Sequence, residues 1–269
     1  MGNVITMSGG YFLAATSSNN PFFFTHWIIT LVGMALVIAS GCVFNNFLDQ
    51  DIDKLMKRTQ NRVIPMGELS GPVSLIYAGI LGLAGLFTLK LIANSLTLFI
   101  AIVGWVVYVI AYSLWLKRTS VYGTLIGGIA GAVPPVVGYT ALTNQIDGAA
   151  ITLFFILFLW QIPHSYAIAI FRLHDYQAAS IPVLPVVKNL RYTQIVMSLY
   201  SVVFAAVTLL PYFLGYKGIA YFIVAALLAI IWITMALAGF WANNVTRWAK
   251  RLFALSILHI TLLCLAMAT

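Results

Sequence analysis

The sequence predicts an all-α protein: a polytopic membrane helical bundle of about nine transmembrane helices around a central cavity open to the cytoplasmic side. The first observation is composition, because a mean hydropathy of +1.00 with only 7% charged residues lies far outside the range of soluble domains. The second is that apolar stretches of bilayer-spanning length recur along all 269 residues. We therefore expect a single transmembrane domain over residues 1–269.

Stretches of about 20 apolar residues place the helices in order along the chain. The spans near 3–16 and 21–44 precede the first long charged loop, 45–70, and the first span is short. The loop is followed by spans at 72–93, 96–116, 122–142 and 148–171, then by a second charged loop, 172–192, and by spans at 193–214, 218–240 and 250–268. Residues 1–48 contain no charged side chain, so they lack the basic start of a cleavable signal peptide.

Charge is distributed unevenly between the two sets of loops. All of the 14 Lys and Arg residues except Lys90 and Lys217 fall on one side, and five of the six acids fall there too, Asp147 being the exception. The positive-inside rule makes that side cytoplasmic. We expect a multi-pass protein of the bacterial cytoplasmic (inner) membrane whose active site faces the cytoplasm. The net charge of +8 follows from this topology and does not indicate nucleic-acid binding.

The acids are concentrated where the second span ends. Asn45, Asp49 and Asp53 are spaced i, i+4, i+8, which places them on one helix face over about 12 Å, with Asp51 roughly opposite. Carboxylates gathered at the end of an apolar run need a cation. Mg²⁺ is usually held by one or two carboxylates together with substrate phosphate oxygens. The pattern therefore predicts a magnesium site.

Basic residues follow the acids directly. Lys57, Arg58 and Arg62 supply donors for the phosphate oxygens that a metal leaves uncovered, which indicates a diphosphate carried on an apolar tail. The alternative is a solvated loop in which Asp53 and Lys57 pair at i, i+4 and support a helix.

The second cytoplasmic loop offers one carboxylate, Asp175, flanked by Arg172 and Lys188. Taken alone, Asp175 fits a helix-end or salt-bridge role as well as a ligand role. If it faces the first loop across a cavity, it becomes a candidate for a second metal site.

At these residues the chain resembles the UbiA-type intramembrane prenyltransferases. Their first signature, Asn-x-x-x-Asp-x-x-x-Asp, is matched by Asn45, Asp49 and Asp53. The resemblance covers nearly the whole chain and is closest to the branch that prenylates haem. It rests on Ser40–Asn46, Arg58–Arg62, Tyr112–Arg118, Gly127-Gly128 with Pro134-Pro135, Trp160–Tyr166, and the segment from Asp175-Tyr176 to Pro185.

The chain departs from the family pattern in two places. It begins at Met-Gly-Asn where the family usually has a preceding segment, so the first helix is expected to be incomplete. The second family motif is normally Asp-x-x-x-Asp, and only Asp175 is acidic here.

The resemblance implies transfer of the farnesyl group of farnesyl diphosphate to a vinyl group of haem b, with addition of water. It implies that Mg²⁺ is the cofactor and that haem b is a substrate. The implied catalytic residues are Asp49, Asp53, Asn45 and Asp175. The first three are also the implied metal ligands, and Asp175 is a further candidate ligand. The implied diphosphate-binding residues are Arg58, Arg62, Lys117, Arg118, Arg172 and Lys188. The expected partners are both substrates, the lipid bilayer and a downstream haem-modifying enzyme or terminal oxidase, with no nucleic acid.

His164 is the histidine of most interest because it follows Pro163 inside an apolar span, where ionisable residues mark functional sites. It either ligates haem iron or lines the porphyrin pocket, or it is a neutral histidine bonded to a neighbouring helix. His174 is a candidate contact for a haem propionate or phosphate. The rings of Tyr112, Tyr166 and Tyr176 stabilise a cation or porphyrin, or pack in the bundle.

Two other functions compete with this interpretation. A transporter also carries intramembrane charges and broken helices, but it predicts inverted internal repeats, and we find no convincing repeat. A prenyltransferase acting on an aromatic or quinone precursor is the nearer alternative. Such an enzyme is expected to have a complete second aspartate motif and to lack the Pro163-His164 segment.

Overall fold

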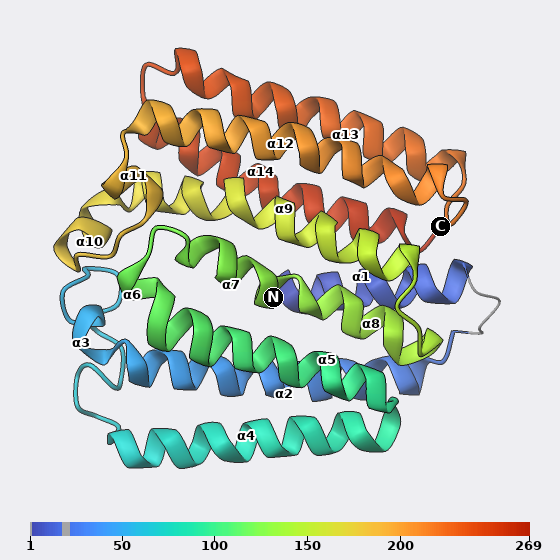
Figure 1. Ribbon diagram of the computed structural model, residues 1–269, viewed down its shortest axis with the longest axis horizontal. Helices are drawn as coiled ribbons and strands as arrows, with labels where there is room; N and C mark the ends of the chain where they lie inside the picture. Colours follow the sequence, from blue (N-terminus) through green and yellow to red (C-terminus); the bar gives the residue numbers. More distant parts are fainter. Residues whose placement is uncertain (1, 18–21) are drawn as a thin grey trace.

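The computed structural model describes residues 2–17 and 22–269, and every regular element in these ranges is a helix. The long helices lie side by side with their axes roughly parallel (Figure 1). Eight helical segments in the described residues are long and apolar enough to cross a membrane. The predicted all-α membrane bundle is therefore confirmed.

The spanning segments follow the chain in order. They are α2 (Phe24–Leu48), α4 (Gly71–Ile92), α5 (Ser95–Val106) continued by the π-helix η1 (Val107–Leu116) and α6 (Lys117–Thr119), α7 (Gly123–Gly131) with α8 (Val133–Thr143), α9 (Gly148–Phe171), α12 (Leu190–Phe213), α13 (Ile219–Leu237) with the 3₁₀ turn η2 (Ala238–Trp241), and α14 (Val245–Ala266). Three short helices, α3 (Gln50–Asp53), α10 (Leu173–Ala178) and α11 (Leu184–Val187), lie in the loops. The first helix, α1 (Gly2–Ser17), has 16 residues and is shorter than these eight, so a ninth span stays a prediction.

Four spanning helices begin at an Asn or Asp side chain that accepts a hydrogen bond from a backbone N–H of the first turn. These N-cap residues are Asn94, Asp147, Asn189 and Asn244. Such a cap satisfies donors that have no partner within the helix. The caps therefore fix where α5, α9, α12 and α14 start.

The centre of the bundle depends on two glycines where α1 crosses α8. A Cβ atom on Gly10 would lie 1.9 Å from the Pro135 carbonyl oxygen, and one on Gly138 would lie 2.0 Å from the Met7 carbonyl oxygen. Only glycine permits this approach of two backbones, as at other small-residue contacts between membrane helices. Helix α8 is consequently buried from Val133 to Ala141.

Helices on the outside of the bundle present apolar side chains outward. On α4, Leu83 and Leu91 are exposed, and on α13, Ile223 and Ile230 are exposed. Exposed aliphatic side chains along a helix of spanning length are suited to lipid rather than water.

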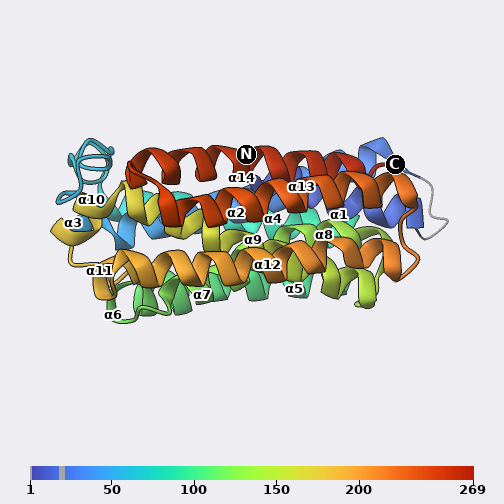
Figure 2. The same cartoon turned by 90° about the horizontal axis from the view of Figure 1, so that it is seen from above.

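Helices α3, α6, α10 and α11 gather at one end of the bundle, which both views place at the left (Figures 1 and 2). The α4–α5, α8–α9 and α12–α13 connections lie at the opposite end (Figure 1); Lys90 is in the last turn of α4, Asp147 caps α9, and Lys217 lies between α12 and α13. The charged loops that are far apart in the sequence therefore meet at one end.

Candidate active site

The two long loops pack against each other over the end of the bundle. Ile52 and Met56 from the first loop form an apolar cluster with Ala179 and Ile181 from the second. The backbone N–H of Lys57 also donates to Asp175 Oδ1 at 3.2 Å. Asp175 thus faces the first loop, as the sequence interpretation required, but it meets a backbone amide there.

Asn45, Asp49 and Asp53 follow one another along a nearly continuous helical path. Helix α2 ends at Leu48, Asp49 adopts φ −92° and ψ 3°, and α3 resumes at Gln50. The amides of Asp49 and Asp53 still donate to carbonyls four residues earlier, at 2.9 and 2.8 Å. The two carboxylates are buried, with 1% and 3% of their residues' surfaces exposed. The spacing therefore places two carboxylates at the inner end of the loop.

Each acid of this segment has a cationic partner. Lys117 donates to Asp49 Oδ2, and Arg62 donates to Asp53 Oδ2 at 2.7 Å. Arg62 also donates to Asn46 Oδ1 at 2.9 Å. The Lys117 pair connects the first loop to α6, and both pairs give the buried carboxylates the positive charge that their burial requires.

Asp51 and Arg118 form a separate pair at the surface. Two nitrogens of the Arg118 guanidinium donate to the two Asp51 oxygens at 2.6 and 2.7 Å. The hydrogen bonds from Arg118 lower the pKa of Asp51 from 3.8 to about 2. The Asp51 side chain is 62% exposed, whereas that of Asp49 is 1% exposed, and Arg118 lies near both.

One feature of the Asp49 carboxylate suits it to bind a divalent cation. Its Oδ1 atom is buried and accepts no hydrogen bond, and Arg118 Nη2 is 3.8 Å away. Asn45 adds an amide oxygen four residues earlier. Within the described ranges no group of three His, Cys, Asp or Glu residues is close enough to hold a metal by itself. A metal here therefore needs oxygen ligands from the substrate, as Mg²⁺ commonly does.

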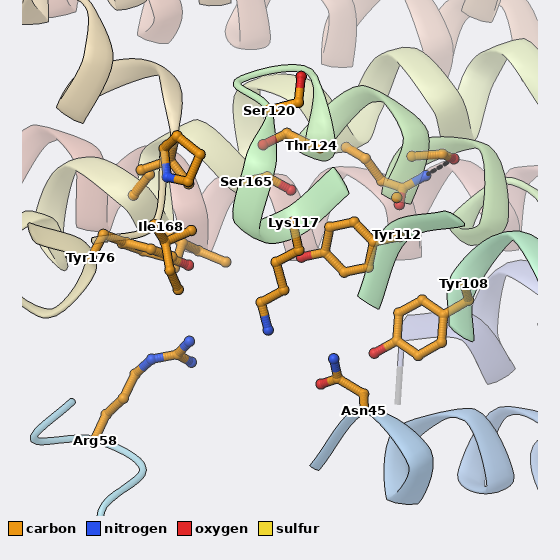
Figure 3. A pocket seen from close by; sticks show the side chains of 18 of the residues that line it. Asn45, Arg58, Tyr108, Tyr112, Lys117, Ser120, Thr124, Ser165, Ile168 and Tyr176 are labelled. Atoms are coloured by element: carbon orange, nitrogen blue, oxygen red, sulfur yellow. Dashed lines mark hydrogen bonds between the residues drawn. The ribbon is translucent and has the colours of Figure 1, made fainter. Parts of the chain in front are cut away.

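A cavity of about 340 Å³ lies beneath the loops. Asn45, Arg58, Arg62, Lys117 and Tyr176 are among its lining residues, together with Tyr108, Tyr112, Ser120, Gly123, Thr124, Gly127, Gly128, Gln161, Ser165, Ile168, Ala169, Ile181, Pro182 and Val183. Figure 3 shows the Arg58 guanidinium and the Lys117 amine extending into one open space that the Asn45 amide also faces. The cavity therefore offers several hydrogen-bond donors to an anion.

Arg58 differs from the other two cations of the cavity. In the described part of the chain it forms no ion pair, and its guanidinium carbon lies 5.9 Å from the centroid of the Tyr176 ring. Burial raises the pKa of Tyr176, and the positive charge of Arg58 acts in the opposite direction. Arg58 is thus available to an incoming anion without loss of a carboxylate partner.

A second cavity of about 200 Å³ adjoins the first. Tyr108, Gly127 and Gln161 line both cavities. Most other residues of the second cavity are apolar: Met34, Val37, Ile38, Ala101, Trp105, Ala130, Val133 and Pro134, with Asn3, Gly41, Cys42, Gly104 and Gly131 completing the lining. A polar chamber and an apolar chamber therefore meet inside the bundle.

The π-helix η1 brings aromatic rings to this junction. Tyr108 and Tyr112 stack with their centroids 5.8 Å apart, and Lys117 follows five residues after Tyr112. The amide of Lys117 donates to the Tyr112 carbonyl, a bond across five residues. Such π-helical segments occur frequently at functional sites. Tyr108 was missed by the sequence interpretation, and its place four residues before Tyr112 was the only signal for it.

Several predicted site residues lie outside the cavity linings. Nδ1 of His164 lies 2.6 Å from Ser256 Oγ on α14, and its ring stacks on Trp160 at 4.5 Å, which matches the alternative of a histidine bonded to a neighbouring helix. Arg118 is occupied by Asp51, Tyr166 is buried, and three predicted residues are exposed at the loops: Arg172, His174 and Lys188. Six of the predicted site residues line the larger cavity: Asn45, Arg58, Arg62, Lys117, Tyr112 and Tyr176.

The fold and the site together define a polytopic helical membrane protein with a cavity lined by cationic side chains beside a second, mostly apolar cavity. The chain belongs to the UbiA prenyltransferase family, whose pattern matches residues 3–258. It is 50% identical, over 99% of its own length and 90% of the relative's, to a protein from Yersinia pseudotuberculosis serotype O:1b (strain IP 31758) named protoheme IX farnesyltransferase.

Solved structures share the fold. A digeranylgeranylglyceryl phosphate synthase superposes with a TM-score of 0.79 at 21% identity, covering 99% of this chain and 93% of that one. A UbiA homolog from Archaeoglobus fulgidus bound to GPP and Mg²⁺ superposes with a TM-score of 0.71 at 13% identity, covering 100% and 96%. At these identities the similarity establishes the fold of the bundle.

Proposed function

We propose that the protein transfers the farnesyl group of farnesyl diphosphate to a vinyl group of haem b, with addition of water, giving haem O and diphosphate. The observation that carries this proposal is the 50% identity over 99% of the chain to a protoheme IX farnesyltransferase. The joined polar and apolar cavities support it, because the substrate has one charged and one apolar part.

The diphosphate is proposed to bind in the larger cavity. Arg58 lies there without an ion pair among the described residues, and Lys117 and Arg62 line the same cavity. Donors held in place around the leaving group stabilise the charge that develops on it as the bond to carbon breaks. Arg172, Arg118 and Lys188 remain candidates for the outer part of this path because they lie at the same end of the bundle.

Asp49 and Asp53, with Asn45, are proposed to hold Mg²⁺, and Asp175 is the candidate for a second ion. The unpartnered Oδ1 of Asp49 supports this assignment. When bound, Mg²⁺ neutralises phosphate charge and acts as a Lewis acid towards the leaving group. A magnesium-bound member of the same fold is consistent with the proposal.

The farnesyl chain is proposed to extend into the apolar cavity, which leaves its first carbon at the junction with the polar cavity. The bond between that carbon and the diphosphate oxygen breaks, and the diphosphate keeps the electron pair. The vinyl group of haem b then bonds to the allylic carbon. The stacked rings of Tyr108 and Tyr112 face this region and favour positive charge over their π-faces.

The site is proposed to face the cytoplasm in the bacterial inner membrane. The end that carries the cavity also carries the first and second charged loops, and the positive-inside rule places such an end in the cytoplasm. A downstream haem-modifying enzyme or terminal oxidase is the proposed recipient of the product.

The test is an assay of the purified protein in lipid bilayers with haem b, farnesyl diphosphate and Mg²⁺. We expect haem O and diphosphate in equal amounts, and no product when the metal is chelated. Diphosphate release without haem O would instead favour an aromatic or quinone precursor as the acceptor. Folded protein that consumes neither substrate would contradict the proposal.

A further inference from the structure

Gln161 lies in the middle of α9, at the junction of the two cavities. It lines both of them, and it belongs to the Trp160–Tyr166 segment, for which the diphosphate and metal sites give no role. A polar side chain in the interior of a membrane bundle is costly and tends to be functional.

The Gln161 carboxamide is held in one orientation. Its Nε2 atom donates to the carbonyl of Gly128 at 3.1 Å and to the carbonyl of Leu157 at 2.9 Å. Both amide protons are thereby used, which fixes the opposite atom, Oε1, as the free acceptor. Within the described residues no donor is bonded to Oε1, and the glutamine that carries this oxygen lines both cavities.

Gly131 provides the space for this carboxamide. A Cβ atom at position 131 would lie 1.9 Å from Gln161 Oε1 and 2.7 Å from its Cδ. The absence of a side chain at Gly131 is therefore required for the observed position of the oxygen. The obstructing atoms belong to the end of a flexible side chain, so an added methyl group displaces the carboxamide without requiring the helices to separate.

We propose that Gln161 Oε1 orients the water molecule that is added in the reaction. This inference rests on the proposed function. After the allylic carbon bonds to the terminal vinyl carbon, the positive charge lies on the carbon attached to the porphyrin. Water forms the new C–O bond there, its oxygen supplying the electron pair, and its proton passes to the departing diphosphate. Gln161 is neutral and too weak a base to take the proton, so its role is to hold the water by accepting one hydrogen bond.

The competing fate of the same cation makes this role measurable. Without an oriented water, the cation loses a proton from the adjacent CH₂ group and gives an alkene, which contains one molecule of water less than haem O. A side chain that served only the packing of α9 would change the rate and leave the ratio of the two products unchanged.

The experiment compares wild type with Gln161→Met, which keeps the length of the side chain and removes the acceptor, and with Gly131→Ala, which keeps the glutamine and displaces its carboxamide. Haem b, farnesyl diphosphate and Mg²⁺ are supplied. The products are separated by chromatography, and mass spectrometry identifies and quantifies each of them. We expect the ratio of alkene to haem O to rise about threefold to tenfold in both variants, the effect of one hydrogen bond on competing rates. Gly79→Ala is the matched control, because nothing lies within 4 Å of a Cβ at that position on α4.

The outcomes separate the two proposals. A wild-type ratio in active Gln161→Met protein would overturn the role of Gln161 and leave the farnesyl transfer intact. A raised ratio in Gln161→Met with a wild-type ratio in Gly131→Ala would also overturn it, since the oxygen would then act from more than one position. Absence of haem O from wild type would refute the proposed function itself.

Discussion

Replacing Asp49 by Asn tests whether the buried acid of the first loop is the electrostatic centre of the site. The matched control is Asp51→Asn, the same change of charge two residues away. The two side chains differ in environment, because the Asp49 side chain is 1% exposed and that of Asp51 is 62% exposed. Of these two acids, Asp49 alone has a buried oxygen without a hydrogen-bond partner in the described residues.

The environments of the two acids set the expected losses of kcat and of stability. Asp49→Asn removes the proposed metal-binding charge, and losing one such electrostatic group costs about 10²–10³ in kcat. It also leaves Lys117 without its carboxylate, at a cost to stability of at most about 3–5 kcal/mol, since the amine borders the cavity. Asp51→Asn breaks an exposed pair worth about 0.2–1 kcal/mol and leaves the cavity unchanged.

The assay measures the initial rate of haem O formation in bilayers as a function of Mg²⁺ concentration, per folded protein. Thermal unfolding in detergent, followed by circular dichroism, gives the folded fraction. We expect a large loss of kcat for Asp49→Asn that added Mg²⁺ does not restore, and near wild-type turnover for Asp51→Asn. Equal losses in the two folded variants would refute the reasoning, because burial would then not distinguish the acids.

Three further predictions concern the fold, pH and the free cation. Gly138→Ala is expected to destabilise the bundle by about 1–3 kcal/mol or more, because its Cβ meets the Met7 carbonyl; thermal unfolding measures this. The folded pKa of Asp51, about 2, is below its unfolded value, so the pair with Arg118 stabilises the fold above about pH 4, and this stabilisation is lost as the pH falls through 2. Wild type should therefore exceed Asp51→Asn in stability at pH 7, and the difference should vanish only below the folded pKa, at about pH 1. Arg58→Gln is expected to raise the KM for farnesyl diphosphate with little loss of stability, because it breaks no ion pair in the described part of the chain.

Each of these has an outcome that contradicts it. Gly79→Ala controls for the added methyl group, and equal stability of Gly79→Ala and Gly138→Ala would show that the α1–α8 crossing tolerates a side chain. A stability difference for Asp51→Asn that is as large at about pH 1 as at pH 7 would mean that the effect is not ionic. An unchanged KM in Arg58→Gln would place the diphosphate away from the Arg58 side of the cavity.

Much of the fold could be predicted from the sequence because the bilayer allows few solutions. Backbone groups in lipid must bond within a helix, so apolar length alone located the spans. Charge asymmetry predicted that loops 45–70 and 172–192 share one end, where the structure places them in contact through Ile52 and Ile181. The i, i+4 spacing of Asn45 and Asp49 was interpretable because helical periodicity is local.

The positions that could not be predicted depend on contacts between distant segments. His164 meets Ser256, which is 92 residues away, and nothing near Pro163 indicates that partner. The resemblance assigned Arg118 to phosphate, and nothing beside it in the sequence indicates that its guanidinium pairs with Asp51. The π-helix changes the spacing between Tyr108 and Lys117 relative to an α-helix, so helical periodicity did not group them.

The ion pairs at the cavity imply that metal and diphosphate bind interdependently. Lys117 and Arg62 line the cavity and also neutralise Asp49 and Asp53. A diphosphate that takes these cations leaves two buried carboxylates without positive charge, which is unfavourable unless a metal replaces it. Conversely, a metal on the carboxylates releases the cations for phosphate. We expect Mg²⁺ to strengthen binding of farnesyl diphosphate by about 5–150-fold, and the diphosphate to strengthen Mg²⁺ binding by the same factor. Calorimetric titration of each ligand with and without the other measures both factors, and a diphosphate affinity independent of Mg²⁺ would show that the cations bind phosphate without leaving the acids.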